Sequence, residues 1–211
     1  MVLKYLIIGV CLFESILSFR RDNNGKTPLM HASESGHLNV VKILINAGMD
    51  IEEKDNTGRN ALLLATSSNH TDIVEFLVCK GADVNVTQEN NNYTPLSWAV
   101  DNKNKYMVNL LISKGANLEH KDIYERTPLI YAVMYNLPDV VELLLNHGAN
   151  VDATDTWGMD AITYASQKGY SEVVELLLVK GFGISPTTEK PEYNTSSVVD
   201  CITPSLDVKS N

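Results

Sequence analysis

The stretch DIYERTPLIYAVMYNLPDVVELLLNHG, from Asp122 to Gly148, decides the fold because its pattern returns at a fixed step on either side. Its triplet Thr127-Pro128-Leu129 is one of five, and the successive steps between them are 33, 34, 33 and 33 residues. The other triplets are Thr27-Pro28-Leu29, Asn60-Ala61-Leu62, Thr94-Pro95-Leu96 and Asp160-Ala161-Ile162. The closing glycines keep the same spacing: Gly48, Gly81, Gly115, Gly148 and Gly181. Self-similarity at such a period predicts a protein built from stacked repeats.

Each repeat carries the signals of two short helices. The residue that opens the first helix always has a side-chain oxygen, which can accept hydrogen bonds from free backbone N–H groups, and in three repeats Pro follows it. The first helices hold alanines in register, small enough to let neighbouring repeats stack closely: Ala32, Ala65, Ala99, Ala132 and Ala165. The second helices carry a wide apolar face, as in Val140-Val141-x-Leu143-Leu144-Leu145. Since one repeat cannot bury such a face alone, the stability must come from stacking between neighbours.

This combination of features resembles the ankyrin repeat family: a period of 33 residues, a turn, a Thr-Pro-Leu triplet and two short apolar helices, from about Asp22 to Gly183. The resemblance implies an all-α solenoid with β-hairpin tips, in which helix-turn-helix units stack into one elongated domain. The expected domain covers residues 21–183, divided into repeats at 21–54, 55–87, 88–121, 122–154 and 155–183.

The composition disfavours nucleic-acid binding, a disulfide framework and a metal site. The formal net charge is −9, which disfavours nucleic acid as a general partner because phosphate binding needs a basic face. The three cysteines, Cys11, Cys79 and Cys201, are scattered and odd in number, so their spacing indicates neither a disulfide framework nor a metal site. We therefore expect no cofactor and no metal.

Residues 1–20 have two interpretations. The apolar run of Met1–Phe19 is typical of a secretory signal with a cut ahead of Phe19, although Glu14 lies close to it. Alternatively, Val2–Ile7 echoes Val40–Ile45, which predicts a capping helix or degenerate half-repeat. We favour the cap and a cytoplasmic location, with secretion as the alternative. The run is too short and interrupted to predict a membrane span.

The other end of the array is expected to lack a cap. Residues 184–211 are rich in Ser, Thr and Pro, which is typical of a disordered tail. The fifth repeat still keeps its apolar second helix, with no polar cap after it. Three alternatives follow: the tail folds back through Val198-Val199 and Ile202, another chain covers that end by end-to-end self-association, or the sequence is a piece of a longer array.

Two local departures from the family pattern carry expectations about stability. Glu125 stands where three other repeats have Gly and repeat three has Asn, and we expect a strained, left-handed backbone there. The usual His after the triplet is replaced throughout by Met30, Leu63, Ser97, Ile130 and Thr163. We expect the hydrogen bonds that this His supplies between turn and helix to be lost, and stability to be modest.

The chain shows no arrangement typical of catalysis. Its five histidines are not paired at i,i+4 and have no partner Cys, and its glycines follow the repeat instead of forming a phosphate-binding loop. We therefore predict that the protein is not an enzyme.

The positions that vary between repeats are the candidates for function. In ankyrin-like folds the tips and one side of the first helices form a concave binding surface, so the resemblance assigns partner contact to those positions. Tyr, Trp and Arg are the usual hot spots of interfaces, and Met adapts to irregular partners. The predicted partner-binding residues are Arg59, Tyr93, Tyr124, Arg126, Met134, Tyr135, Trp157 and Met159. Trp98, Tyr131 and Tyr164, inside the first helices, are expected to pack within the array.

The leading hypothesis is a non-enzymatic scaffold or adaptor that binds a protein segment in the concave face of repeats three to five. One alternative is a secreted, toxin-like ankyrin effector, suggested by the apolar N-terminus and by four Asn-x-Ser/Thr sequons, at Asn69, Asn85, Asn92 and Asn194. Another is a small-ligand sensor or regulatory subunit, in which cations such as Arg126 and Lys26 would hold an anionic aromatic ligand.

Overall fold

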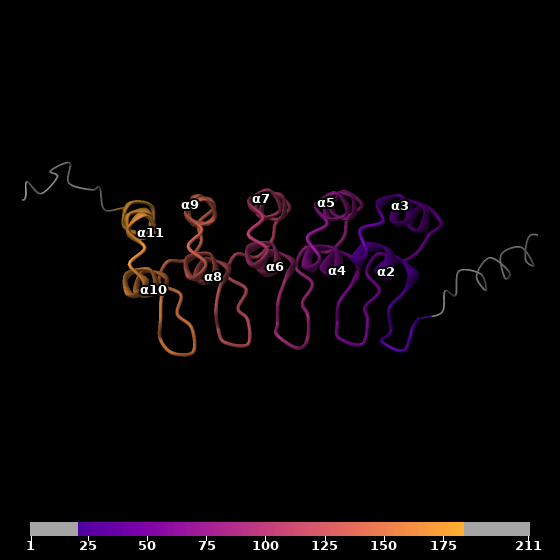
Figure 1. Ribbon diagram of the computed structural model, residues 1–211, viewed down its shortest axis with the longest axis horizontal. Helices are drawn as coiled ribbons and strands as arrows, with labels where there is room; N and C mark the ends of the chain where they lie inside the picture. Colours follow the sequence, from indigo (N-terminus) through magenta and orange to yellow (C-terminus); the bar gives the residue numbers. More distant parts are fainter. Residues whose placement is uncertain (1–20, 184–211) are drawn as a thin grey trace, which may run out of the picture.

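The computed structural model describes residues 21–183, which form five repeats in a single row (Figure 1). Each expected repeat contains one pair of helices, and a short π-helical segment, η1, ends the last pair. The elements are α2 (Pro28–Glu34), α3 (Leu38–Asn46), α4 (Ala61–Ser67), α5 (Thr71–Cys79), α6 (Pro95–Asp101), α7 (Lys105–Ser113), α8 (Pro128–Met134), α9 (Pro138–Asn146), α10 (Ala161–Lys168), α11 (Ser171–Leu176) and η1 (Leu177–Gly181). The sequence predictions for residues 1–20 and 184–211, a cap or signal peptide and a disordered tail, lie outside the described part.

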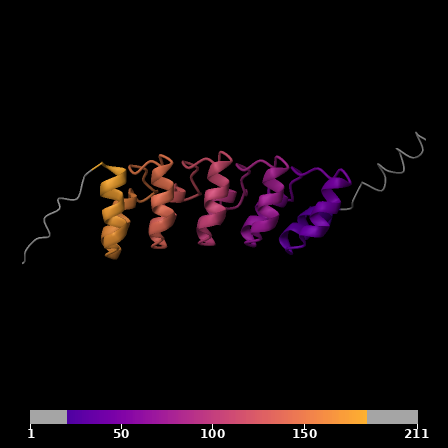
Figure 2. The ribbon, with the colours of Figure 1, turned by 90° about the horizontal axis from the view of Figure 1, so that it is seen from above.

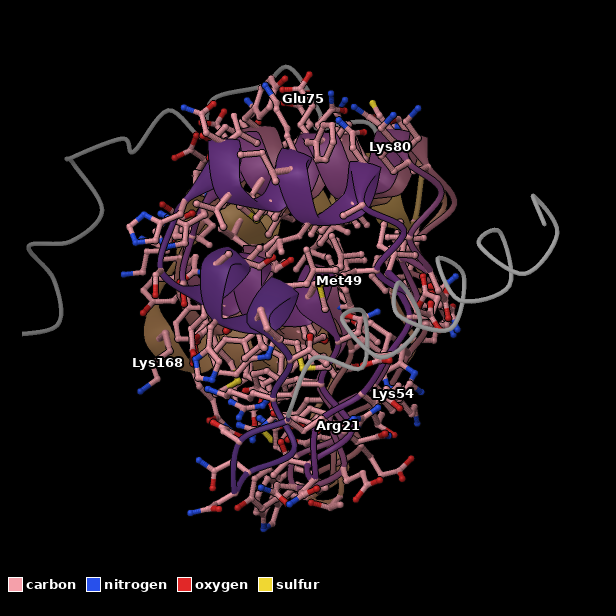
Figure 3. All side chains as sticks on the ribbon, turned by 90° about the vertical axis from the view of Figure 1, so that its right-hand side faces the viewer. Arg21, Met49, Lys54, Glu75, Lys80 and Lys168 are labelled. Carbon is pink, nitrogen blue, oxygen red and sulfur yellow. The ribbon has the colours of Figure 1, made fainter. Side chains whose placement is uncertain are left out.

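The helices lie in two layers. The second helices, α3 to α11 with odd numbers, form one row, the first helices form a parallel row, and the connecting loops extend beyond the first helices (Figure 1). Seen from above, the second helices lie side by side (Figure 2). The end-on view shows that α3, α2 and the loops are stacked in that order (Figure 3). The expected all-α repeat stack is confirmed.

The start and end of each first helix follow the sequence signals. Five side chains, Thr27, Asn60, Thr94, Thr127 and Asp160, each accept a hydrogen bond from the backbone N–H three residues on. One or two residues after each first helix comes a residue with positive φ, namely Gly36, Asn69, Lys103, Asn136 or Gly169. This left-handed residue turns the chain sharply and lets the second helix run back over the first.

One continuous apolar core runs through the row. The registered alanines of the first helices are between 0% and 6% exposed. Each packs beneath apolar residues of the second helices, such as Leu77, Leu111 and Leu144, which are fully buried. Each repeat therefore depends on its neighbours for burial, as expected for a solenoid.

The loops at the tips are turns, and within residues 21–183 no strand forms, in contrast to the expected β-hairpins. A single backbone hydrogen bond joins each tip to the preceding one. The four bonds run from Asn56 N to Asn24 O, Glu89 N to Thr57 O, Ile123 N to Asn91 O and Thr156 N to Tyr124 O, at 3.0 to 3.3 Å. One bond per tip holds the loops in a row but does not make a ladder.

The turn and the first helix are connected in three repeats by the side chain one position beyond the missing His. His31 contacts the Asp22 carboxylate at 3.0 Å, and the hydroxyls of Tyr131 and Tyr164 donate to Asp122 and Asp155, each at 2.6 Å. The expectation that this connection is lost is therefore wrong for repeats one, four and five.

Candidate functional site

A connected group of aromatic side chains crosses repeats three to five. We name it the aromatic strip and define it by Tyr93, Tyr124, Arg126, Tyr131, Tyr135 and Trp157. It runs from the tips of the fifth and fourth repeats, along α8, to the start of α6. Five of its six members were predicted from the sequence as partner-binding residues.

Asp122, at the start of the fourth tip, anchors the strip. One carboxylate oxygen accepts the backbone N–H groups of Tyr124 at 2.9 Å and Arg126 at 2.8 Å. The other oxygen accepts from the Arg126 guanidinium at 3.1 and 3.2 Å and from the Tyr131 hydroxyl at 2.6 Å. With its side chain only 1% exposed, Asp122 is a buried acceptor whose partners fix both the turn and the ring of Tyr131.

Arg126 lies between two aromatic rings. Its guanidinium carbon is 4.4 Å from the centre of the Tyr124 ring and 4.7 Å from that of Tyr131. The side chain is 15% exposed and its charge is paired with Asp122. Arg126 therefore holds the strip together, with its charge paired to Asp122 and its guanidinium next to two rings.

A relay of hydroxyls continues the strip into the third repeat. Tyr93 donates to the Tyr131 oxygen at 2.7 Å, and Tyr131 in turn donates to Asp122. Burial, with the hydrogen bond to Asp122, raises the pKa of Tyr131 well above its usual value, and burial likewise raises the pKa of Tyr93. Both hydroxyls stay protonated at neutral pH and act as fixed donors.

Tyr135 forms the helical part of the strip. Its ring stacks on that of Tyr131 with centres 5.9 Å apart, and its hydroxyl donates to Asp101 of α6 at 2.5 Å. Burial and this hydrogen bond raise its pKa. The ammonium of Lys103 lies 5.8 Å from the ring centre. Tyr135 therefore joins repeats three and four while one side of its ring remains partly exposed.

Tyr124 and Trp157 form the exposed end of the strip. Their rings stack with centres 5.7 Å apart at an angle of 23°. Even so, Tyr124 is 43% exposed and Trp157 is 65% exposed, and the neighbouring Ile123 is 53% exposed. Together these three side chains make an apolar patch on the tips of the fourth and fifth repeats, which is the kind of surface that partners bury.

The structure places the three other predicted residues outside the strip. Arg59, in the second repeat, pairs with the buried carboxylate of Asp55 at 2.9 Å. Met134 is half-buried at the end of α8. Met159 is half-buried, with its sulfur 3.8 Å from the amide nitrogen of Gln167. They flank the surface but are not part of the connected group.

Three residues central to the strip were not among the predicted site residues. Tyr131 was expected to pack internally, and it does, at 3% exposure, but it also connects the other members. Asp122 and Asp101 supply the acceptors. The role of Asp122 could have been inferred from the sequence, because an Asp recurs at the start of four repeats: Asp22, Asp55, Asp122 and Asp155.

Lys26, the second cation considered for an anionic ligand, is also paired. Its ammonium lies 2.6 Å from the Glu34 carboxylate and its side chain is 12% exposed. Since both Arg126 and Lys26 are already neutralised by nearby acids, the geometry offers no support for a small anionic ligand at these positions.

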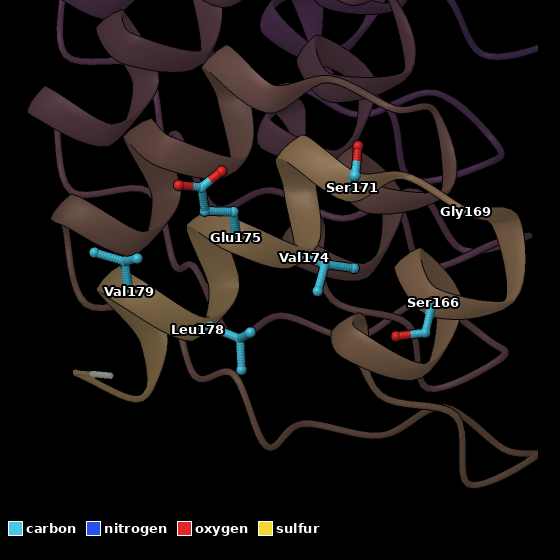
Figure 4. A pocket seen from close by; sticks show the side chains of 7 residues that line it. All are labelled: Ser166, Gly169, Ser171, Val174, Glu175, Leu178 and Val179. Atoms are coloured by element: carbon cyan, nitrogen blue, oxygen red, sulfur yellow. The ribbon is translucent and has the colours of Figure 1, made fainter. Parts of the chain in front are cut away.

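The end of the fifth repeat has an open apolar face. A pocket of about 350 Å³ is lined there by Ser166, Gly169, Ser171, Val174, Glu175, Leu178 and Val179 (Figure 4). Val174 is partly exposed, whereas its equivalents Val41, Val74, Val108 and Val141 are fully buried. The last helix pair therefore presents the surface that would contact a following repeat.

Two kinds of site are absent from the described part of the chain, a metal centre and a membrane-spanning helix. Between residues 21 and 183, no group of three or more His, Cys, Asp or Glu side chains is placed to hold a metal ion. Over the same residues, every helix is too short or too polar to cross a bilayer.

The row of stacked helix pairs, which all share one pattern, defines the class: a helical repeat protein. The sequence profile described as "Ankyrin repeats (3 copies)" matches residues 2–88, 54–122 and 96–190. The chain therefore belongs to the ankyrin repeat family, whose members generally serve as protein–protein interaction modules. Comparison with curated proteins gave no match.

Proposed function

We propose that the protein is a non-enzymatic scaffold or adaptor that binds a protein segment along the aromatic strip. The single observation that supports this most is the exposed pair Tyr124 and Trp157, which stack on each other and are still 43% and 65% exposed. Burying two such rings is a large apolar gain for a partner.

The remainder of the strip prepares this surface for binding. Arg126 and Asp122 hold the tip of the fourth repeat, and Tyr131 supports the ring of Tyr135 from below. Because the charges of Arg126 and Asp122 are already paired with each other, a protein segment can cover the rings without leaving a buried charge unpaired. A preformed surface also lowers the entropic cost of association. The partner that fits is an apolar or aromatic segment lying across tips four and five.

The test compares partner capture by the wild type and by the double variant Tyr124→Ala/Trp157→Ala, using cross-linking in cells followed by mass spectrometry. Arg126 is left unchanged because its loss would break the bond to Asp122 and confuse folding with binding. We expect the double variant to lose the partners captured by the wild type, with an unchanged circular dichroism spectrum. Tyr106→Ala is the matched control, since Tyr106 is 57% exposed on α7, in the other helix layer. Equal capture by the double variant would remove the proposal.

The proposed location is the cytoplasm. Cys79, the cysteine that lies within residues 21–183, is free and exposed, which suits a reducing compartment. Two sequon amides also serve the array: Asn85 donates from Nδ2 to Gly115 O at 3.2 Å and Asn92 donates to Lys121 O at 2.8 Å. A glycan on either nitrogen would disturb these contacts between repeats, which weighs against the secreted effector.

End-to-end self-association through the fifth repeat is a second candidate, supported by the open pocket beside Val174 and Leu178. Sedimentation velocity over a concentration series tests it. Association that Leu178→Asp abolishes would support this candidate, and a monomer at all concentrations would remove it.

A further inference from the structure

In the first repeat, the second helix, α3, exposes an apolar face that is buried in the second helices of the other repeats. Val40 is the third residue of α3 and is 44% exposed. Its equivalents in the other four repeats are nearly inaccessible: Ile73 0%, Met107 0%, Val140 2% and Val173 0%. Ile43, beside it, is 66% exposed, whereas its equivalents are partly buried.

The two ends of the row show which neighbour buries this position. Val173 is fully buried although no helix pair is described after it, whereas Val40 is exposed although α5 follows it. The third position of a second helix is therefore buried by the preceding second helix. Within residues 21–183, no second helix lies on the N-terminal side of α3.

The sequence supplies the matching pattern at the repeat step. Counting back 33 residues from Val40-Val41-x-Ile43-Leu44-Ile45 gives Ile7-Ile8-x-Val10-Cys11-Leu12, which is apolar at all five positions. This register differs by five residues from the echo of Val2–Ile7 noted in the sequence. It also keeps the step of 33 that separates the triplets of repeats one and two.

One further observation agrees with this register. The same step places Asp22 before Asp55, and both carboxylates bind the turn of their own repeat. The match to the ankyrin profile begins at residue 2, ahead of Asp22, and so covers this stretch in the register of Ile7 and in that of Val2 alike. The C-terminal side gives a contrast, because the positions 33 residues after Val173, Val174, Leu176 and Leu177 are Leu206, Asp207, Lys209 and Ser210, of which one is apolar.

We propose that residues 5–13 pack as the second helix of a half-repeat on the open face of α3, with Ile7 and Val10 in the register of Val40 and Ile43. The half-repeat buries the face of Val40 in the way that α3 buries Ile73. Twenty residues precede Arg21, enough for a nine-residue helix and the connection to the first turn.

This packing has a consequence for function that is independent of the aromatic strip. A stretch that closes the first repeat has to stay attached to the folded protein for the face of Val40 to remain covered. It also occupies the surface that a second copy would need for head-to-tail stacking on α3.

Hydrogen exchange of the full-length chain, read by mass spectrometry, tests the proposal. We expect the amides of residues 5–13 to exchange at least about tenfold more slowly than an unstructured chain, since a packed helix must open before it exchanges. In Val40→Asp, which places a charge on the covered face, this protection should be lost while the remaining repeats keep theirs. The matched control is Tyr106→Asp, at a position of α7 where Asp72 and Asp139 stand in the neighbouring repeats.

Each contrary outcome is distinct. Exchange of residues 5–13 at the unstructured rate in the wild type overturns the proposal without any variant, and so does protection that Val40→Asp leaves intact. An intact mass showing a chain cut ahead of Phe19 overturns it in favour of a leader. Protection that appears only as protein concentration rises assigns the face of α3 to a second copy instead. If Val40→Asp fails to fold, Val40→Ser repeats the comparison with a smaller change.

Discussion

Repeats two and four have the same turn but different surfaces. In each, an Asp at the start of the tip pairs with the Arg four residues on: Asp55 with Arg59 at 2.9 Å and Asp122 with Arg126 at 3.1 Å. At the positions where repeat four has Tyr124, Tyr131 and Tyr135, repeat two has Thr57, Leu64 and Ser68. The pairing that shapes the turn is thus shared, and only the side chains carried on it differ.

The comparison separates residues that make the array from residues that use it. The Asp–Arg pair appears with or without aromatic neighbours, so it belongs to the scaffold. Repeat two lacks these tyrosines, and in repeat four Tyr124 stacks on Trp157 of the next tip. Substitutions at the shared Asp and Arg positions should therefore change stability, and substitution of the exposed Tyr124 should change binding.

The largest effect is expected for Asp122→Ala. It leaves the Arg126 charge and the Tyr131 hydroxyl without an acceptor in a nearly buried site, and breaking such a pair costs about 3 kcal/mol. Asp55→Ala should cost about 1 kcal/mol less, because the hydroxyl that donates to Asp55, that of Thr57, is only partly buried, whereas that of Tyr131 is buried. Urea unfolding followed by circular dichroism measures both. Equal losses would show that the Tyr131 contact contributes nothing to stability.

An intermediate loss of stability is expected for Tyr164→Phe in the fifth repeat. There Asp155 has the Tyr164 hydroxyl as its side-chain partner, because Met159 stands where repeats two and four have Arg. Burial raises the pKa of Asp155, but hydrogen bonds from the Tyr164 hydroxyl and two backbone N–H groups outweigh it, so the pKa lies below 3.8. The stability that this depressed pKa contributes is present above pH 3.8 and is lost as the pH falls through the folded-state value. Removing the hydroxyl should cost about 1.5 kcal/mol at pH 7.

The pH dependence checks the cause of that loss. In the variant the pKa of Asp155, followed by NMR, should rise towards 3.8, and the stability difference from the wild type should shrink as the pH is lowered below that value. A difference that is constant between pH 7 and pH 2.5 would mean that packing, not the charged acceptor, accounts for it.

A smaller change in stability, this time a gain, is expected from a substitution of Glu125, the third residue after Asp122. Glu125 has φ of 61°, as its place in the turn predicts, and Gly58 has φ of 79° at the equivalent position of repeat two. Glu125→Gly should stabilise the protein by about 1 kcal/mol, because a left-handed backbone is strained for all residues except Gly. The Lys121 contact that is lost is an exposed ion pair and contributes little.

The reciprocal change gives the control. A Cβ on Gly58 would lie 2.9 Å from Glu89 Cγ and 3.2 Å from the Thr87 carbonyl, so Gly58→Ala should lower the melting temperature. If Glu125→Gly also lowers it, the turn of repeat four gains from the Glu side chain more than it loses from strain.

The sequence predicted the repeated features well because they recur five times. The N-cap residues, the left-handed helix ends and the alanine register each follow from local chemistry that every repeat restates. The aromatic positions Tyr93, Tyr124, Tyr135 and Trp157 were also visible, since they stand out against the repeat pattern. All of these can be derived from one sequence without knowledge of contacts between repeats.

The remaining features depend on contacts that the repeat pattern does not encode. Arg126 was predicted to face a partner, and nothing in the sequence indicated that Asp122 and two rings also contact its guanidinium. Tyr131 replaces the missing His from one position further along, because a longer side chain reaches the same carboxylate. Nor did the sequence predict turns in place of β-hairpins, since the number of hydrogen bonds between tips depends on how far each loop extends.

The smallest change in stability is expected for Tyr124→Thr, which gives tip four the residue of tip two. The variant loses a stack with Trp157 and a contact with Arg126, both partly exposed and each worth about 0.5 to 1 kcal/mol. It should regain part of this, because Thr57 donates its hydroxyl to Asp55 at 2.7 Å and a Thr at 124 can bond to Asp122 in the same way. We expect a net change within about 0.5 kcal/mol by urea unfolding, together with weaker partner capture. A loss above about 2 kcal/mol would place Tyr124 among the residues that build the array, and the separation of scaffold from binding surface in repeat four would no longer hold.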